Sequence, residues 1–432
     1  MLDIRRIRLE PDVIKELLAR RGEDVSKIDA LLALDVERRK VMTESESRKA
    51  EQNRIGPQIA QRRKAGEDTS DLMAASTELK SLLVGLEEKV RELDGQQEAL
   101  LGKLPNTPLP DVIAGGEDKA VILTEPSRAV RDFAFEPKAH WDLLASLGLT
   151  DAERAVKLAG SGFVLYTGMG NRLQRALIAM MLDKHTSNHG YTEVGVPYVL
   201  SRESITASGH IVKFVDEMYH DEVSDLFFVP TSEPAMVNIF RDEILSGDDL
   251  PIKLVAHTPC WRREAGAAGK DTRGLQRVHQ FDKVELFRYV RPDDSENALA
   301  EMTQDACNIL DDLEIPWRLL GLAAGDIAFS AAKTIDIEAW SPGVGKWLEV
   351  SSASCCTDFQ SRRAKIRFRP EPGAKPEFVH LLNASGLALP RVVAALLETH
   401  QQEDGSIRVP AALQPYLGGM TVLESGQTRW PA

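Results

Sequence analysis

The chain has 432 residues, of which 43% are hydrophobic and 28% charged, a composition typical of a soluble protein with two or more domains. No run of eighteen apolar residues occurs, and the opening MLDIRRIRLEPD lacks the apolar core of a secretory signal, so a membrane-spanning or secreted protein is not expected. The net charge of −13 argues against unspecific nucleic-acid binding, although a specific contact needs only one basic face.

The first predicted element is a long helical hairpin. Residues 28–64 and 71–103 have helix-compatible patterns, and AGEDTS at 65–70 supplies a turn in which Ser70 is the expected cap. In the second helix leucines recur every seven residues, at Leu72, Leu79, Leu86, Leu93 and Leu100. This strict heptad predicts a coiled-coil seam. At 1.5 Å per residue each helix would reach roughly 50 Å, too long for burial in a globular core, so we expect a projecting antiparallel arm.

The two helices of this arm differ in charge. Residues 38–64 contain nine arginines or lysines and three glutamates, whereas residues 71–103 contain four basic and seven acidic side chains. One basic helix suggests a surface that follows nucleic-acid phosphates. A solvated coiled coil, or an arm that docks a protein, explains the same charges equally well.

A second domain follows a linker rich in helix breakers. PNTPLP at 105–110 and Gly115-Gly116 mark residues 105–119 as the linker, which separates an N-terminal domain at 1–104 from a second domain at 120–432. The second domain combines a helix with several short strand-like runs, expected at 171–189 and at 192–199, 226–230, 252–261 and 277–290. Regular β-helix-β units are missing, which favours an α+β fold with an antiparallel sheet flanked by helices.

The cysteines indicate a reducing environment. The four are Cys260, Cys307, Cys355 and Cys356, and they form no CxxC pair. Since two of them are adjacent, neither disulfide nor zinc-ligand spacing is present, and a reduced cytoplasmic protein is expected, with Cys355 and Cys356 packed in the core.

The basic stretch RREAGAAGKDTRGLQRVHQF, residues 262–281, contains neither a Walker A loop nor a GxGxxG turn, so a solvated surface loop is one interpretation. Strand-like sequences on both sides instead predict the loop of a β-hairpin. Alternation along the strands would place Arg262 with Glu264 on one face, and Arg277 with Phe281 on one face of the partner strand. Guanidinium groups pair with phosphates and an aromatic ring stacks on a base, which suits a bound ATP.

Two further segments add weaker signals. In LLNASGLALPRVVAALLETHQ (381–401), small residues precede Arg391 at the start of a helix, where backbone can approach a ligand and anions are favoured. GYTEVGVP (190–197) ends in a proline that stops ladder pairing, as expected at a sheet edge that forms an interface.

Taken together, these segments resemble the three ordered motifs of class II aminoacyl-tRNA synthetases. The motifs are Gly190–Val194–Pro197, Arg262–Glu264 with Arg277–Phe281, and the small-residue turn that ends in Arg391. Further blocks narrow the resemblance to bacterial-type seryl-tRNA synthetases: TSE (231–233), REAGAAGKDTRGLQRVHQFDKVE (263–285), WLEVSSASCCTDFQSRR (347–363) and HQQEDGSIRVPAALQPYLGG (400–419). The helical hairpin also resembles that family's tRNA-binding arm. The implied fold is a coiled-coil arm joined to a class II catalytic domain.

The resemblance implies a two-step reaction, in which serine and ATP form seryl-adenylate and the seryl group then passes to tRNA(Ser), with tRNA(Sec) left open as a second acceptor. Arg262 and Arg391 match the catalytic arginines of the family. The positions matching its serine site are Thr231, Ser232, Glu233, Glu285 and Ser385. The positions matching its ATP site are Arg262, Arg263, Glu264, Arg277, Val278, Phe281, Glu349, Val350, Ser351, Ser352 and Arg391.

The family resemblance also implies a metal and partners. Glu349 and Ser352 match positions that hold Mg²⁺, a hard cation suited to oxygen ligands. The tRNA contacts are expected on the basic helix, at Arg48, Lys49, Arg54, Arg62, Arg63 and Lys64. The interior of the basic loop, with Lys270 and Arg273, is expected to meet the acceptor end. A cytoplasmic homodimer is expected.

Alternatives to this function follow from departures from the family pattern. Pro234 follows the TSE triplet where Val is usual, and Ile335 replaces an aromatic residue. These changes leave open a duplicated enzyme that serves antibiotic tolerance or a biosynthetic pathway. A non-catalytic coiled-coil adaptor is a third hypothesis, which the presence of Arg262, Glu264 and Arg391 disfavours.

Overall fold

The computed structural model describes residues 1–264 and 273–427. The chain forms two compact units, one comprising Leu2–Pro105 and the other Met1 with Asn106–Ala432. None of the described helices combines the length and the apolar character needed to cross a membrane.

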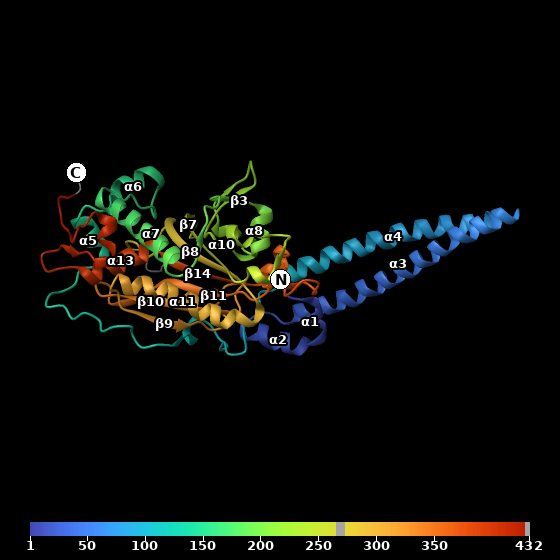
Figure 1. The fold of residues 1–432 in the computed structure, drawn as a ribbon, viewed down its shortest axis with the longest axis horizontal. Coiled ribbons are helices and arrows are strands. Elements are labelled where there is room, and N and C mark those ends of the chain that lie inside the picture. The colour runs from blue at the N-terminus through green and yellow to red at the C-terminus, as the bar shows by residue number, and fades with distance from the viewer. Residues whose placement is uncertain (265–272, 428–432) are drawn as a thin grey trace. The chain divides into compact units, whose positions relative to one another are not determined.

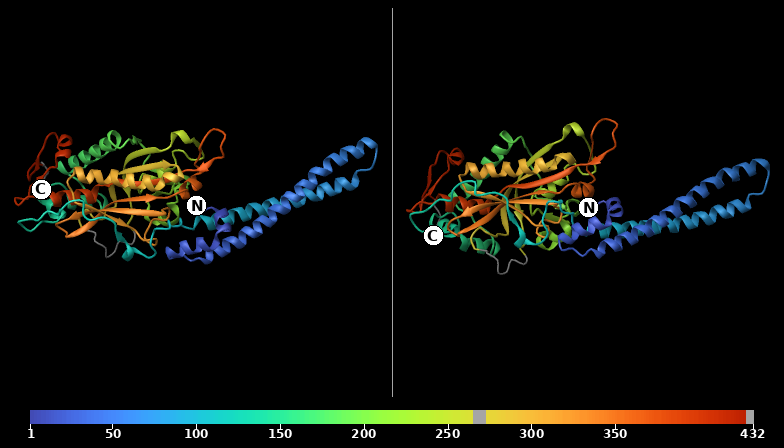
Figure 2. Two further views of the ribbon diagram at one scale, coloured as in Figure 1. Left: turned by 60° about the horizontal axis from the view of Figure 1, so that its bottom comes forward. Right: turned by 90° about the horizontal axis from the view of Figure 1, so that it is seen from below.

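The smaller unit is a helical hairpin with two short helices before it. Its helices are α1 (Ile4–Leu9), α2 (Pro11–Arg20), α3 (Ser26–Ala65) and α4 (Ser70–Gly102). α3 and α4 lie side by side along their lengths (Figures 1 and 2). Ion pairs Arg38–Asp94 and Arg62–Asp71 give them an antiparallel register.

The predicted seam is confirmed on α4. Leu79, Leu83, Leu93 and Gln97 are buried, Leu86 and Val90 are partly buried, and most other side chains between Leu79 and Gln97 are exposed. Successive members of this set are four or three residues apart, which is the spacing of a coiled-coil seam. The expected cap at Ser70 is wrong: α4 begins at that residue, whose N–H and hydroxyl donate to the carboxylate of Asp68, at 3.0 and 2.6 Å.

The seam contains a buried polar cluster. Asp35 on α3 is only 1% exposed. Its carboxylate accepts from Gln97 Nε2 at 3.0 Å and pairs with Arg8 Nε at 2.8 Å. The paired carboxylate avoids the penalty of an unsatisfied buried charge and fixes the register of the two helices.

The larger unit is built on an eight-stranded sheet within the described residues, so the predicted α+β class is confirmed. In spatial order the strands are β1 (Val121–Ile122), β9 (Trp317–Gly321), β10 (Lys333–Ser341), β11 (Lys346–Cys355), β14 (His380–Ala388), β8 (Gln280–Val290), β7 (Ile252–Trp261) and β2 (Thr192–Glu193). Neighbours are antiparallel except β2 and β7, which are parallel. The segment GYTEVGVP thus contributes the edge strand β2.

Helices and small sheets surround this sheet (Figure 1). The helices are α5 (His140–Ser146), α6 (Ala152–Ala159), α7 (Met169–Ser187), α8 (Arg202–Ser208), α9 (Ile211–Phe214), α10 (Glu233–Val237), α11 (Ser295–Asp312), α12 (Phe359–Ala364) and α13 (Leu389–His400). The remaining strands are β3 (Val199–Ser201), β4 (His220–Asp221), β5 (Leu226–Phe228), β6 (Ile244–Ser246), β12 (Arg367–Arg369), β13 (Glu377–Phe378), β15 (Ile407–Arg408) and β16 (Val422–Leu423). The four cysteines are buried free thiols.

The two faces of β8 serve different purposes. Even-numbered Val284 and Leu286 belong to the main core, which also contains residues of α7, α11 and α13. On the opposite face, Phe287 and Tyr289 belong to a second core. Because strand side chains alternate between faces, the earlier odd-numbered positions of β8 share a face with the second core. Those positions carry the polar residues of the site.

Candidate active site

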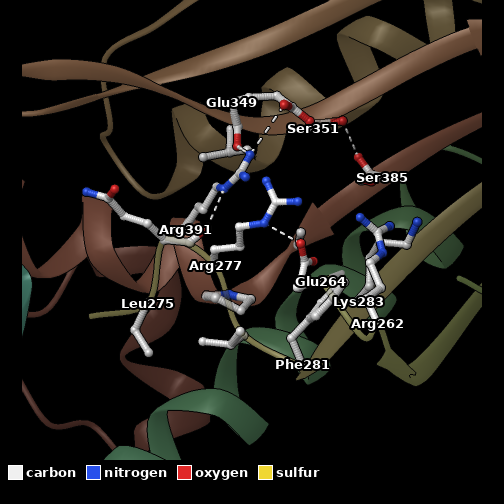
Figure 3. Close-up of a pocket in the computed structure, with 15 residues that line it drawn as sticks. Arg262, Glu264, Leu275, Arg277, Phe281, Lys283, Glu349, Ser351, Ser385 and Arg391 are labelled. Atoms are coloured by element: carbon white, nitrogen blue, oxygen red, sulfur yellow. Dashed lines mark hydrogen bonds and ion pairs between the residues drawn. The ribbon is translucent and has the colours of Figure 1, made fainter. Parts of the chain in front are cut away.

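A cavity of about 280 Å³, called cavity A here, lies between the β7–β8 hairpin, β11 and the start of α13 (Figure 3). Its polar lining includes four cations, a carboxylate from the hairpin and one from β11: Arg262, Arg277, Lys283, Arg391, Glu264 and Glu349. Phe281 supplies an aromatic wall, and the guanidinium carbon of Arg262 lies 5.2 Å from its ring centre. A concave site with this excess of positive charge suits a polyanion that carries a ring.

The arginines of cavity A are held by acceptors on two sides. Arg277 pairs with the carboxylate of Glu264. Arg391 donates to the Gln276 carbonyl at 3.1 Å and to the Glu349 carbonyl at 2.8 Å, so it bridges the returning loop and β11. These contacts orient the guanidinium groups while leaving both side chains about a third exposed to the cavity.

The expected alternation of Arg262 with Glu264, and of Arg277 with Phe281, is wrong as a description of strands. β7 ends at Trp261 and β8 begins at Gln280, so only Phe281 of these four lies on a strand. Glu264 has a left-handed backbone (φ 51°), an uncommon conformation for a residue other than glycine. The four side chains nevertheless line one cavity, because the loop turns Glu264 toward Arg277.

A second cavity of about 430 Å³, called cavity B, shares six lining residues with cavity A: Arg262, Glu264, Arg277, Lys283, Glu349 and Ser385. Thr231 lines cavity B as well, and three charged groups of its lining are buried, those of Glu233, Lys283 and Glu285. Lys283 Nζ donates to Thr231 Oγ1 at 2.7 Å and pairs with Glu285. The site therefore places carboxylates and cations within one small polar pocket, as a zwitterion requires.

Burial changes the acid–base behaviour of cavity B. It raises the pKa of Glu285 to about 7, although the charge of Lys283 opposes the shift. Burial also raises the pKa of Glu233, whose carboxylate accepts from Gln360 Nε2 at 2.6 Å. Both carboxyl groups are thus costly to ionise, and a bound cation would favour their charged forms.

Glu349 and Ser352 lie three apart on β11, a spacing that would put them on opposite faces of a regular strand. Here Glu349 pairs with Glu338 and Ser351 with Ile337, so Val350 is left unpaired as a β-bulge. The extra residue brings Glu349 and Ser352 to one face, and both line cavity B. A carboxylate and a hydroxyl there fit a hard cation bound jointly with phosphates.

Comparisons with known proteins identify the family. Residues 1–108 match the seryl-tRNA synthetase N-terminal domain, and residues 214–400 match the tRNA synthetase class II core domain (G, H, P, S and T). The chain is 49% identical over 424 residues to the serine–tRNA ligase of Gemmatimonas aurantiaca, with 97% of this chain and 99% of that protein covered. The chain belongs to the seryl-tRNA synthetase family.

Two other relatives of the same family agree with this. The serine–tRNA ligase of Clostridium tetani is 46% identical over 426 residues, with 98% of this chain and 100% of that protein covered. The crystal structure of seryl-tRNA synthetase from Pyrococcus horikoshii complexed with ATP is 39% identical and superposes with a TM-score of 0.93, over 98% of this chain and 100% of that one. The resemblance to seryl-tRNA synthetases is confirmed.

Most of the expected site residues meet at the two cavities. In cavity A lie Arg262, Glu264, Arg277, Val278, Phe281, Glu349, Val350, Ser351, Ser385 and Arg391, and cavity B adds Thr231, Glu233, Glu285 and Ser352. Ser232 is buried and Arg263 is exposed, and neither lines a cavity. Arg273 lies 4.5 Å from the ring centre of Trp141, whereas Lys270 falls outside the described residues.

Lys283, His210 and Asn383 are among the cavity residues that the sequence did not predict. Lys283 had a signal, because Phe281, Lys283 and Glu285 alternate on β8 and so share a face. His210 had none; its Nε2 lies 3.6 Å from a Glu233 oxygen, and burial lowers its pKa to about 3, with Lys283 and Arg262 adding to the shift.

The departure at Pro234 is accommodated without loss of a hydrogen bond. Pro234 stands in the first turn of α10, where a missing N–H costs nothing because no helical acceptor is available. Glu233 remains in cavity B beside it. Ile335 is partly buried and packs against the main core.

The expected tRNA-binding residues lie on α3 in the smaller unit. Lys49, Arg54 and Lys64 are exposed and make no ion pair among the residues that the structure describes. Arg48 instead pairs with Glu51 at 3.2 Å, and Arg62 pairs with Asp71 at 3.0 Å. Unpaired cations cost least to bring to a phosphate, since no ion pair must break.

Proposed function

We propose that this chain is a serine–tRNA ligase, which activates L-serine with ATP and transfers the seryl group to the 3′ end of tRNA(Ser). The single observation that carries the proposal is the junction of cavities A and B at Arg262, in a chain of the seryl-tRNA synthetase family. A polyanion site next to a zwitterion site is what adenylate formation requires. An adaptor without catalysis would not need this buried charge.

In the proposed ATP complex, cavity A holds the nucleotide. Phe281 stacks on the adenine ring and Glu264 accepts from its amino group. Arg277 and Arg391 exchange their carboxylate and carbonyl partners for the outer phosphates. Val278, Val350 and Ser351 form the remaining walls.

In the proposed serine complex, cavity B holds the amino acid. Glu233 and the Thr231 hydroxyl receive the ammonium group, and Glu285 and Ser385 reach the amino and hydroxyl groups of serine. A pocket that hydrogen-bonds a substrate hydroxyl rejects alanine strongly, because its buried polar groups would be left unpaired.

The first chemical step is attack of the serine carboxylate on the α-phosphorus of ATP, with pyrophosphate leaving. Arg262 borders both cavities, so its guanidinium reaches the carboxylate and the α-phosphate together. Its Nε donates to the Pro230 carbonyl at 3.3 Å, which orients the group before reaction. Catalysis then consists of positioning and of stabilising the charge that develops on phosphate oxygens.

Glu349 and Ser352 would hold Mg²⁺ with the phosphates. The bound ion would supply neutralisation of phosphate charge. The cations of α3 bind the tRNA backbone in this proposal, and we further propose a cytoplasmic homodimer with β2 at its interface. Use of tRNA(Sec) needs a separate charging assay.

Serine-dependent ATP–pyrophosphate exchange tests the first step, and charging of purified tRNA(Ser) tests the second. We expect both activities, with alanine and threonine as poor substrates. Absence of exchange with serine contradicts the proposal, and exchange without charging points to another acceptor.

A further inference from the structure

We propose that His140, oriented by Glu398, is a positioning residue for the nucleotide site, because it anchors the segment 275–277 that forms one wall of cavity A. Neither residue lines either cavity. The inference rests on the proposed function, since it names a residue that tunes ATP binding in that reaction.

The anchor begins at Glu398 on α13, whose side chain is fully buried. Its Oε1 accepts from the His140 backbone N at 2.8 Å and lies 2.7 Å from His140 Nδ1. Its Oε2 accepts from the backbone N of Gly343 at 2.8 Å and of Val344 at 3.3 Å, and from the Ser341 hydroxyl. So many donors compensate the burial of a carboxylate.

The neighbours of His140 fix its tautomer. The backbone N of Leu275 lies 3.0 Å from Nε2 and can only donate, so Nε2 carries no proton and accepts. The ring proton is therefore on Nδ1 and is donated to Glu398. The imidazole is neutral and has a defined direction, from the Leu275 N–H to the buried carboxylate.

This bond holds the chain where it returns from the loop toward β8. Leu275, Gln276 and Arg277 all line cavity A, together with Arg391 (Figure 3). The Leu275 side chain is buried, and its N–H finds its acceptor in His140. Two residues later, Arg277 presents its guanidinium to the site.

Residues 273 and 274, next to Leu275, also contact helix α5. Arg273 lies over the ring of Trp141, the residue after His140. Gly274 has φ +68°, and a Cβ there would collide with the His140 ring. The backbone thus approaches the imidazole more closely than any other residue would allow.

Helix α13 links the anchor to the cavity from the other side. Arg391 lies in its first turn and Glu398 seven residues later, two turns along the same face. Arg391 donates to the Gln276 carbonyl at 3.1 Å. The segment is therefore held at adjacent residues, through Leu275 by His140 and through Gln276 by Arg391.

Without the imidazole acceptor, the Leu275 N–H would be buried and unsatisfied, or the segment would move to reach water. ATP would then have to order this wall when it binds. The expected signature is a rise in the KM for ATP, with kcat and the KM for serine near their original values, because bound ATP restores the wall.

The test is serine-dependent ATP–pyrophosphate exchange by the full chain and three variants of His140. His140→Leu removes both hydrogen bonds and should raise the KM for ATP roughly ten- to a hundredfold, the range expected for one unsatisfied buried donor. His140→Gln should restore most of the affinity, since its carbonyl oxygen can occupy the position of Nε2. His140→Asn should not, because its amide reaches only the position of Nδ1.

His400→Leu is the matched control. His400 is also buried, on the last turn of α13, and its Nε2 lies 2.8 Å from the Leu313 carbonyl, outside both cavities. The His400→Leu variant should have a lower midpoint of thermal unfolding, as His140→Leu does, but an unchanged KM for ATP. An equal rise in both variants, no rise in His140→Leu, or rescue by Asn as good as by Gln would overturn the inference.

Amide hydrogen exchange of the unchanged protein decides the case if His140→Leu does not fold. The Leu275 amide should exchange as slowly as the core strands, and fast exchange would rule out the anchor. If the unchanged protein shows no serine-dependent ATP–pyrophosphate exchange, the proposed function fails. Equilibrium dialysis of ATP with the same variants then still tests the anchor.

Discussion

The arm formed by α3 and α4 and the pair of cavities use charge in opposite ways. On the arm most charged side chains are exposed, and pairs such as Arg48–Glu51 contribute little because water screens them. In cavity B, Lys283 and Glu285 are only 6% and 2% exposed and form an ion pair. Removal of either side chain would therefore leave the other as an unpaired buried charge. Single changes on the arm should therefore have graded effects, whereas single changes at the cavities should have large ones.

The largest effect is expected at the junction of the two cavities. Arg262→Ala should lower the rate of serine-dependent exchange by about a hundred- to a thousandfold or more, the loss typical for a group that stabilises transition-state charge. Steady-state exchange kinetics measure it. Arg202→Ala, which breaks a surface pair with Asp225, is the control. A loss below about tenfold at Arg262 would contradict the assigned role.

Removing the arm should separate the two steps of the reaction. The ion pair of Arg38 with Asp94 shows that α3 and α4 are close together at these two residues. A short linker can therefore replace residues 38–95. Exchange with ATP and serine should continue, because both cavities lie in the other unit, while charging of tRNA(Ser) should be lost. Charging at an undiminished rate would show that the arm does not bind the tRNA.

Serine binding should depend on pH through Glu285. Its pKa is raised to about 7, so as the pH falls through that value the carboxyl becomes neutral and no longer attracts the ammonium group. The KM for serine should rise by about tenfold for each pH unit below 7. It should level off above about pH 8.

Without serine, the pH dependence of folding stability that is due to Glu285 should have the opposite sign. A raised pKa in the folded state favours the native protein most below the unfolded pKa, and this contribution is lost as the pH rises through about 7. Glu285→Gln removes both dependences. A serine KM that varies with pH in the same way in this variant would assign the effect to another group.

The smallest effect is expected for one cation of the arm. Arg54→Ala should weaken tRNA binding several-fold and reduce the slope of log affinity against log salt by about one, because one phosphate contact is lost. Arg91→Ala, on the more acidic helix α4, is the control and should leave the slope nearly unchanged. Filter binding across a salt series measures both.

Local patterns in the sequence determined much of the fold. The heptad from Leu72 to Leu100 predicts the seam between α3 and α4, since helical periodicity depends only on neighbours in sequence. The α+β class and the edge strand at GYTEVGVP were also predicted. The residues of cavity A were predicted from the ordered motifs that resemble those of class II synthetases. The strand alternation predicted for Glu264 and Arg277 was wrong, because both residues lie beyond the ends of their strands.

Only the tertiary structure decided how distant groups meet. The bulge at Val350 brings Glu349 and Ser352 to one face, and it follows from the pairing of β10 with β11 rather than from composition. His140 and Glu398 are 258 residues apart, and no periodicity links them. Their contact depends on how α5 and α13 pack, a property of the whole chain, whereas helix and strand patterns depend on a few neighbouring residues.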